Sequence, residues 1–328
     1  MEKKKLGSQG LEVSHLGLGC MGMSEFYGSN NDEESIKTIH HAVDLGITFF
    51  DTSDMYGPFK NEELLGKAFK GIRDKVVIAS KFGILRTGDP NVRAINGRPE
   101  YVKSSCDASL KRLGVDYIDL YYQHRIDANT PIEDTVGAMA DLVKEGKVRF
   151  IGLSEAGSNT IKRAHKIHPL TALQSEYSLW SRDPEDEILH LVNELGIGFV
   201  AYSPLGRGFL TGRFKTVDDL EQNDYRRVSP RFQGDNFKKN LRLIDTINEI
   251  AKTKGVTPGQ LALAWVLARN KIIVPIPVTT KAKHLDENIA ALEIKITEEE
   301  LSKIDKLLPA GSASGTRYPE SMMSLLNG

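Results

Sequence analysis

Short apolar runs alternate with amphipathic segments along almost the whole chain. Eight runs rich in β-branched and aromatic residues recur, and each is followed by a segment with helical spacing and helix start or stop signals. This alternation is typical of βα units that build a parallel sheet. The eight runs are HLGLGC (15–20), GITFFDTS (46–53), KVVIASK (75–81), YIDLYYQH (117–124), RFIGLSE (149–155), TALQSEYS (171–178), GFVAYSP (198–204) and IIVPIPV (272–278).

The segments between these runs predict helices. Residues 32–46 place Ile36, Ile39, Ala42 and Val43 on one stripe and stop at Gly46, while residues 99–114 run from a proline to a glycine. A threonine three residues before an acidic or amide side chain predicts a capping box at the start of a helix. Three such boxes are expected, at Thr130–Glu133, Thr257–Gln260 and Thr297–Glu300.

The unbroken alternation favours a closed (β/α)₈ TIM barrel over an open sheet, because no shift in composition divides the chain. We expect a single domain over residues 1–328, preceded by a small β-hairpin around Gly10 and supplemented by extra helices. Residues 206–236 are too long and polar for a simple connection and predict a lid or binding loop. The C-terminal tail from Pro309 is either a loosely docked end or a segment that closes the substrate pocket.

Composition points to small-molecule partners. The 328 residues include 43 Lys and Arg against 44 Asp and Glu, so no global field favours nucleic acid or an anionic membrane. Only two cysteines occur, Cys20 and Cys106, which is no disulfide framework and fits a reducing compartment. Neither a leader nor an apolar window of about 18 residues is evident. We therefore expect a cytoplasmic protein that binds neither membranes nor nucleic acid.

Two motif matches are rejected on context. GLGCMG, residues 17–22, fits the dinucleotide fingerprint G-x-G-x-x-G, but a turn-rich segment follows it instead of the helix that must meet the pyrophosphate. Tyr56 and Lys60 fit a Y-x-x-x-K dyad, but Gly57 and Pro58 prevent them from sharing a helical face. No nucleotide-triphosphate loop or zinc spacing occurs, so neither a metal nor NTP chemistry is expected.

Four side chains follow consecutive predicted strands and form a coherent acid site. They are Asp51, Tyr56, Lys81 and His124. Each alone is more simply a turn cap, a loop aromatic, a charge that ends a strand, or a core histidine. Together they fit proton donation, because an ammonium such as Lys81 lowers a phenol pKa from its ordinary ~10. Asp51 would offset the burial of Lys81, and His124 would orient a carbonyl oxygen.

The chain strongly resembles the aldo-keto reductase superfamily over nearly its whole length. The motifs that carry the resemblance include FFDTSDMYG, VVIASK, YIDLYYQH, LQSEYSLW, VAYSPLGRGFLTGR and IPVTTKAKHLDENIAAL. DMYG, GLSEA and RRVSPRFQGDNF are similar to the auxin-induced-type branch, which includes perakine-reductase-like enzymes. The resemblance implies that Asp51, Tyr56, Lys81 and His124 match the catalytic tetrad of the family.

The resemblance also implies an NADPH site. Tyr202 would stack on the nicotinamide, and Ser154 and Gln174 would bind its carboxamide. The backbone at Cys20 and Met21 would lie near the ribose, and Lys281 and Arg213 would favour a 2′-phosphate over NADH. Ser203, Pro204, Leu205, Gly206 and Gly208 would wrap the pyrophosphate. Arg213, Thr279, Thr280, Lys281 and His284 would surround the adenosine 2′-phosphate, with Glu287 and Asn288 at the adenine. Asp51 completes the implied set with Cys20, Met21, Ser154, Gln174 and Tyr202.

Three positions depart from the usual pattern of the family. Glu155 stands where many relatives have Asn, Val278 where Gly is usual, and His284 where Arg or Gln is frequent. The first departure affects a carboxamide contact and the second the backbone beside the phosphate.

The predicted function is NADPH-dependent reduction of aldehydes or ketones, with Tyr56 as the general acid. Two alternatives remain open. One is a nucleotide-binding regulatory subunit like the potassium-channel beta subunits. The other is an NAD-linked sugar or polyol dehydrogenase. A substrate pocket is expected from Met55, Phe82, Trp180, Arg207 and residues 222–236, although Phe82 and Trp180 fit ordinary packing slightly better.

Overall fold

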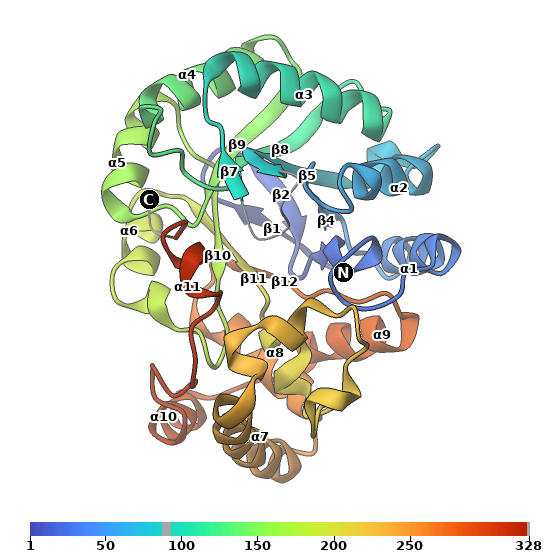
Figure 1. Ribbon diagram of the computed structural model, residues 1–328, viewed down its shortest axis with the longest axis vertical. Coiled ribbons are helices and arrows are strands. Elements are labelled where there is room, and N and C mark those ends of the chain that lie inside the picture. Colours follow the sequence, from blue (N-terminus) through green and yellow to red (C-terminus); the bar gives the residue numbers. More distant parts are fainter. Residues whose placement is uncertain (87–92, 327–328) are drawn as a thin grey trace.

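The computed structural model describes residues 1–86 and 93–326, and its centre is a barrel of eight parallel strands (Figure 1). The hydrogen-bonded order is β12-β11-β10-β9-β8-β5-β4-β3, so neighbours in the barrel follow the order of the chain. All eight predicted strands are confirmed. Their bounds are β3 (Leu18–Gly19), β4 (Phe49–Asp51), β5 (Val77–Phe82), β8 (Ile118–Gln123), β9 (Val148–Ser154), β10 (Ala172–Glu176), β11 (Gly198–Tyr202) and β12 (Ile273–Ile276).

Glycines close the barrel between its first and last strands. A parallel bridge pairs Gly19 with Val278, and the Gly19 N–H donates to the Pro277 carbonyl at 3.1 Å. A Cβ added at Gly19 would lie 2.8 Å from Val278 Cγ2, and one at Gly17 would lie 2.7 Å from the Phe49 ring. The glycines of the GLGCMG motif are therefore required by strand packing, and a three-residue 3₁₀ turn, Met21–Met23, follows them.

Helices surround the strands, as Figure 1 shows. At least one helix follows each barrel strand. The last strand is followed by three, α9, α10 and α11. The helix predicted over 99–114 is confirmed, and Gly114 ends it in a left-handed conformation with φ 65°. The bounds are α1 (Asp32–Asp44), α2 (Lys60–Ala68), α3 (Pro99–Leu113), α4 (Ile132–Lys144), α5 (Ser158–Ile167), α6 (Ile188–Glu194), α7 (Gly234–Lys254), α8 (Pro258–Arg269), α9 (Ala282–Ala290), α10 (Glu298–Leu307) and α11 (Glu320–Met323).

Two of the three predicted capping boxes form. Thr257 caps α8 and Thr297 caps α10, each with the reciprocal bond from the third helical residue. The box predicted at Thr130 is wrong, because α4 begins after Pro131 and has no side-chain cap. The Thr130 hydroxyl instead donates to Asp127 Oδ2 at 2.8 Å, so a local acceptor in the preceding loop competes successfully for it.

The predicted N-terminal hairpin plugs the bottom of the barrel. Strands β1 (Lys3–Leu6) and β2 (Leu11–Ser14) pair antiparallel. Leu6, Leu11 and Val13 pack against the inward-facing side chains of the barrel strands, including Phe49 and Tyr122. A second, larger cluster lies between the strands and the helices. With the lower end filled by apolar side chains, the upper end at the strand C-termini is left for a ligand.

Three segments lie over that upper end. Residues 206–236 form four short 3₁₀ turns before α7 begins at Gly234. A two-stranded antiparallel ribbon, β6 (Ile84–Arg86) with β7 (Arg93–Ile95), was not predicted, because its strands are three residues long. The tail returns across the barrel mouth and ends in α11, drawn in red in Figure 1, although its residues 327–328 lie outside the described part.

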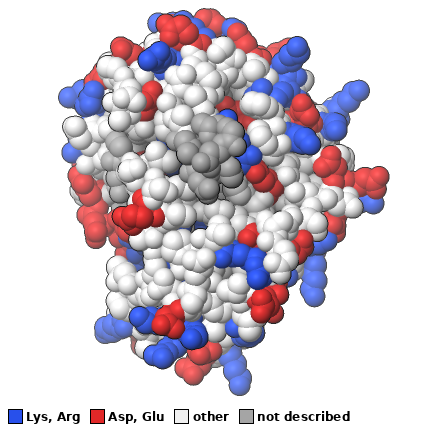
Figure 2. Space-filling model, viewed as in Figure 1, with Lys and Arg blue, Asp and Glu red and all other residues white. Residues whose placement is uncertain are grey.

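The surface carries both charge signs in a mixed distribution. Figure 2 shows Lys and Arg interspersed with Asp and Glu over the face drawn, in agreement with a net charge of −1. No described helix combines the length and the hydropathy needed to cross a membrane.

Candidate active site

The four side chains predicted for the acid site meet at the upper rim of the barrel. Asp51 ends β4, Tyr56 lies in the turn that follows, Lys81 is near the end of β5, and His124 comes directly after β8. Pairing of adjacent strands brings them together, with Asp51 opposite Ala79 and Phe82 opposite Gln123. The His124 N–H donates to the Phe82 carbonyl at 2.8 Å, which extends the sheet register to the histidine.

Lys81 connects three of its neighbours by hydrogen bonds. Its fully buried ammonium donates to Asp51 Oδ1 at 2.5 Å, to the Thr52 carbonyl at 2.7 Å and to the Tyr56 hydroxyl at 3.2 Å. An ammonium has three protons, so these bonds engage all of them. Because Lys81 donates to the phenol oxygen, the proton of the Tyr56 hydroxyl points away from Lys81.

Burial controls the protonation of the phenol. Burial tends to lower the pKa of Lys81, but Asp51 and Tyr56 outweigh it, and the pKa of Lys81 lies above its ordinary value. Burial raises the pKa of Tyr56 to about 12, against a smaller opposite effect of Lys81. The expectation of a lowered Tyr56 pKa is therefore wrong for the protein without bound ligands, because the effect of burial is larger than the effect of the Lys81 ammonium. Tyr56 keeps its proton throughout the neutral range.

His124 is neutral at the same rim. Burial first, then the charges of Arg125 and Lys81, hold the pKa of His124 well below its ordinary value. Its Nδ1 lies 3.2 Å from the Ser53 hydroxyl, which is the shortest contact of that hydroxyl to an acceptor. We assign the ring proton to Nε2, with Ser53 donating to Nδ1. A neutral imidazole in this tautomer donates a hydrogen bond from Nε2.

A cavity of about 680 Å³ opens above these groups. Asp51, Tyr56 and His124 line it, whereas Lys81 lies behind them and has no exposed surface. The expected wall residues Met55 and Arg207 also line it, with Asn223, Tyr225 and Val228 from the predicted binding loop. Phe82 and Trp180 do not, because Phe82 stacks on Tyr121 and Trp180 on Phe209, so both are packing residues.

Several cavity residues were missed by the sequence analysis. The β6 strand and the loop before α1 supply Glu25, Phe26, Tyr27, Ile84 and Arg86. The tail supplies Tyr318, Pro319, Ser321, Met322, Leu325 and Leu326, so of the two readings of the tail, the one with a role at the pocket is supported. The apolar SMMSLL sequence was the available signal for the tail, while Arg125 had only its place beside His124.

The residues expected around the nicotinamide line the same cavity. Ser154, Gln174, Tyr202 and Met21 all belong to its wall. Gln174 donates to Asp51 Oδ2 at 2.7 Å, and the Tyr202 hydroxyl lies 3.1 Å from the Tyr318 hydroxyl.

An adjoining cavity of about 430 Å³ collects the residues expected around the phosphates and adenine. It shares Tyr27, Ser203, Arg207 and Val278 with the first cavity. The expected residues that line it are Ser203, Pro204, Leu205, Gly208, Arg213, Thr279, Thr280, Lys281, His284, Glu287 and Asn288. The two cavities together form a path from the tetrad to a groove that Arg213 and Lys281 line.

Two expected cofactor residues do not line either cavity. The Cys20 N–H donates to the Asp51 carbonyl, and the Cys20 carbonyl accepts from Asn61, so both backbone groups are already bonded. Gly206 faces Trp180, and a Cβ there would lie 2.7 Å from the indole ring. Its positive φ of 56° also favours glycine, so Gly206 shapes the loop instead of forming its wall.

The three departures from the family pattern have structural consequences. Glu155 adopts a positive φ of 53°, and its carboxylate accepts from the Glu176 N–H at 2.8 Å and from Arg317 at 3.1 Å. Val278 belongs to the bridge that closes the barrel. Burial first, then Arg213, lowers the pKa of His284, while Glu287 raises it.

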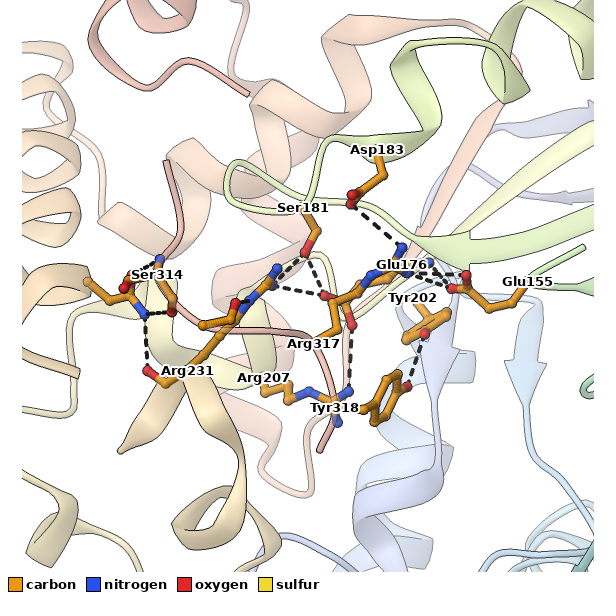
Figure 3. Close-up of polar contacts among 12 residues, drawn as sticks. Glu155, Glu176, Ser181, Asp183, Tyr202, Arg207, Arg231, Ser314, Arg317 and Tyr318 are labelled. Carbon is orange, nitrogen blue, oxygen red and sulfur yellow. Dashed lines mark hydrogen bonds and ion pairs between the residues drawn. The ribbon is translucent and has the colours of Figure 1, made fainter. Parts of the chain in front are cut away.

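Arg317 anchors the tail in a buried ionic network (Figure 3). Besides its pair with Glu155, it lies 3.6 Å from Asp183. Deeper in the network, Glu176 lies 3.2 Å from Arg231 and 3.5 Å from Arg207. Figure 3 shows Tyr318, the next residue of the tail, directed at Tyr202. The ion pair with Glu155 thus places the tail beside the residue expected to stack on nicotinamide.

Both the sequence and the fold match known proteins. The model of the Aldo/keto reductase family matches residues 15–309. A probable aldo-keto reductase 1 of Glycine max is 53% identical over 316 residues, which cover 96% of this chain and 91% of the relative. A glycerol dehydrogenase from Gluconobacter oxydans has a TM-score of 0.84 at 27% identity, covering 93% of this chain and 94% of that one. An aldo/keto reductase from Klebsiella pneumoniae, solved with NADP and acetate, has a TM-score of 0.74 at 28% identity, covering 97% and 99%.

Proposed function

Because this chain belongs to the Aldo/keto reductase family, we propose that it reduces aldehydes or ketones with NADPH, and that Tyr56 is the proton donor. The observation that carries the proposal is the bonding of Lys81. Its ammonium donates to Asp51, Thr52 and Tyr56, and both Tyr56 and His124 line one cavity. We also propose that residues 1–328 form one domain and that the chain belongs to the auxin-induced-type branch of the family.

Tyr56 is suited to act as a general acid. Its pKa of about 12 keeps the phenol protonated at neutral pH, and the bond from Lys81 leaves the phenol proton free to face the cavity. An alkoxide that develops from a carbonyl group is a stronger base than a phenolate, so the proton transfer is downhill. The Lys81 ammonium then stabilises the phenolate that remains, as its hydrogen bond strengthens with the new charge.

His124 would orient the carbonyl group. The Nε2 proton assigned above donates to the carbonyl oxygen, and the neutral ring does not compete with Tyr56 as an acid. The two rings stand 6.0 Å apart between centroids at an interplanar angle of 84°. Because both residues line one cavity, a carbonyl oxygen bound there would have both side chains as donors.

The described residues fit a dinucleotide phosphate. No described carboxylate lies within 4 Å of the Arg213 guanidinium, whereas Lys281 pairs with Glu34 at 2.6 Å, and both cations line one groove. A dianionic 2′-phosphate would pair with Arg213 and replace Glu34 as the partner of Lys281. Tyr202 would stack on the nicotinamide, and Ser154 with Gln174 would hold its carboxamide, at the tetrad end of the path. The bound cofactor supplies the hydride for the reaction.

An NADPH-oxidation screen over aldehydes, ketones and dicarbonyls tests the proposal. We expect turnover with several aldehydes and a lower Kd for NADPH than for NADH. Tight NADPH binding without any turnover would favour a regulatory subunit instead. A preference for NADH together with rapid oxidation of sugars or polyols would favour the dehydrogenase alternative.

A further inference from the structure

Arg125 is a buried cation in the wall of the substrate cavity. It follows His124 at the end of β8, and only 7% of its surface is exposed. Its Nη1 donates to the His124 carbonyl at 2.7 Å and to the Ser154 hydroxyl at 3.1 Å. Its Nη2 lies 3.5 Å from the Tyr318 hydroxyl, a long contact. All three partners are neutral.

The hydrogen-bonding capacity of Arg125 is not filled by the described residues. A guanidinium has five N–H groups, and these three contacts use at most three of them. No Arg125 nitrogen is among the described atoms that are sealed from solvent without a partner. The Nε atom has no described partner, so its absence from that set means that its N–H is not sealed from solvent, on a side chain that lines the cavity.

Its charge is also left without a described counterion, in contrast to its neighbours. Lys81 pairs with Asp51, Arg317 with Glu155, and Arg231 with Glu176. Arg86, in the same cavity wall, pairs with Glu25 at 2.5 Å. Among the described carboxylates, none lies within 4 Å of Arg125. Glu155, which is paired with Arg317, acts on Arg125 only from a longer range, so a ligand that supplies an anion would give this buried cation a direct partner.

Arg207 differs from Arg125 in its position. It lines both cavities and lies 3.5 Å from Glu176, which also pairs with Arg231. A cofactor diphosphate that passes between the two cavities would meet Arg207. Arg125 lines only the cavity of Tyr56 and His124, so the substrate is the ligand that can meet its charge.

We propose that the preferred substrates are carbonyl compounds that carry a carboxylate, and that Arg125 binds this carboxylate while His124 and Tyr56 hold the carbonyl oxygen. This inference rests on the proposed reductase function. A carboxylate fits because the free N–H groups of one guanidinium form a planar fork, with the Tyr318 hydroxyl as an additional donor. A dianionic phosphate would need more than one unpaired cation, whereas Arg86 and Arg207 in this wall already pair with Glu25 and Glu176.

The test compares acids with their neutral esters. The probes are 2-, 3- and 4-formylbenzoate and the methyl ester of each, which retains the shape and removes the charge. We expect at least one acid to exceed its ester at least tenfold in kcat/KM with NADPH. The best isomer then reports how far the carboxylate lies from the reacting carbon. This comparison uses the unaltered protein and does not depend on the folding of a variant.

Two variants identify the residue responsible. Arg125→Gln should reduce the ratio of acid to ester to about one, and Arg125→Lys should retain part of it. Arg86→Gln removes a positive charge from the same wall, but from a residue already paired with Glu25, so the ratio should stay within about twofold of the unaltered protein.

Three results would overturn the inference. One is equal turnover of acids and esters by the unaltered protein, which leaves the reductase function intact. Another is a rise in the NADPH Kd of Arg125→Gln with an equal loss for acids and esters, which would assign Arg125 to the nicotinamide end. If no aldehyde supports NADPH oxidation, the proposed function itself fails, and the inference with it.

Discussion

Removal of the Tyr56 hydroxyl is the sharpest perturbation of the proposed mechanism. Tyr56→Phe keeps the ring in its 84° contact with His124 and deletes only the group that accepts from Lys81 at 3.2 Å. Lys81 retains its shorter bonds to Asp51 and to the Thr52 carbonyl. We therefore expect the fold to survive, with a stability loss of about 1–2 kcal/mol for one unpaired N–H of the ammonium.

The effect on catalysis should be much larger. A positioned general acid contributes about 10²- to 10⁴-fold, and the hydroxyl has no substitute here, because His124 is held neutral by burial. Turnover of a good aldehyde should fall by this factor, which corresponds to roughly 3–5 kcal/mol of transition-state stabilisation. The Kd for NADPH should stay within about twofold, because the groove with Arg213 and Lys281, where the phosphates are expected, lies in the adjoining cavity.

The assay is single-turnover oxidation of enzyme-bound NADPH, followed by its fluorescence, with a fluorescence titration for Kd. Tyr121→Phe is the matched control. Tyr121 is fully buried against the helices, and its hydroxyl has no partner among the described residues, so this variant should keep its turnover. If Tyr56→Phe turns over aldehyde as fast as the control, Tyr56 is not the acid and the reasoning from Lys81 is refuted.

Three further predictions follow from other parts of the site. Lys281→Met should raise the Kd of NADPH about tenfold and leave that of NADH unchanged in fluorescence titrations, because it removes one phosphate partner from the groove; equal effects on both would contradict this. Burial first, and Glu62 second, raise the pKa of Asp54 to about 7. Protonation of Asp54 therefore stabilises the folded protein fully below about pH 4, and this stabilisation is lost as the pH rises through 7. Asp54→Asn should accordingly be more stable than the unaltered protein at about pH 8, by roughly 4 kcal/mol at most, and lose this advantage near pH 4 in urea unfolding. Arg317→Met should lower stability by about 3 kcal/mol in thermal unfolding and make the tail sensitive to protease, because it leaves Glu155 unpaired, and adding Glu155→Gln should restore most of the loss.

The sequence was informative wherever the signal is local. The spacing of apolar residues and the capping residues were sufficient to predict the eight strands and most helices. Both signals depend on residues only a few positions apart. The ends of the apolar runs also placed Asp51, Tyr56, Lys81 and His124 on one rim, since parallel strands of a barrel all end at the same face. Thr130 shows the limit of such signals, because Asp127 in the preceding loop took the hydroxyl that was expected to cap a helix.

Tertiary structure decided what depends on burial and on contacts between distant residues. The sign of the pKa change at Tyr56 is one example, because the ammonium could be anticipated from the chain, whereas the larger desolvation exists only in the packed barrel. The pairing of Glu155 with Arg317 joins residues 162 positions apart and brings the tail to the cavity. Arg125 is the clearest case. The chain alone shows an arginine after a histidine, and only the folded structure shows that its neighbours are neutral and that the nearby carboxylates are paired with other cations.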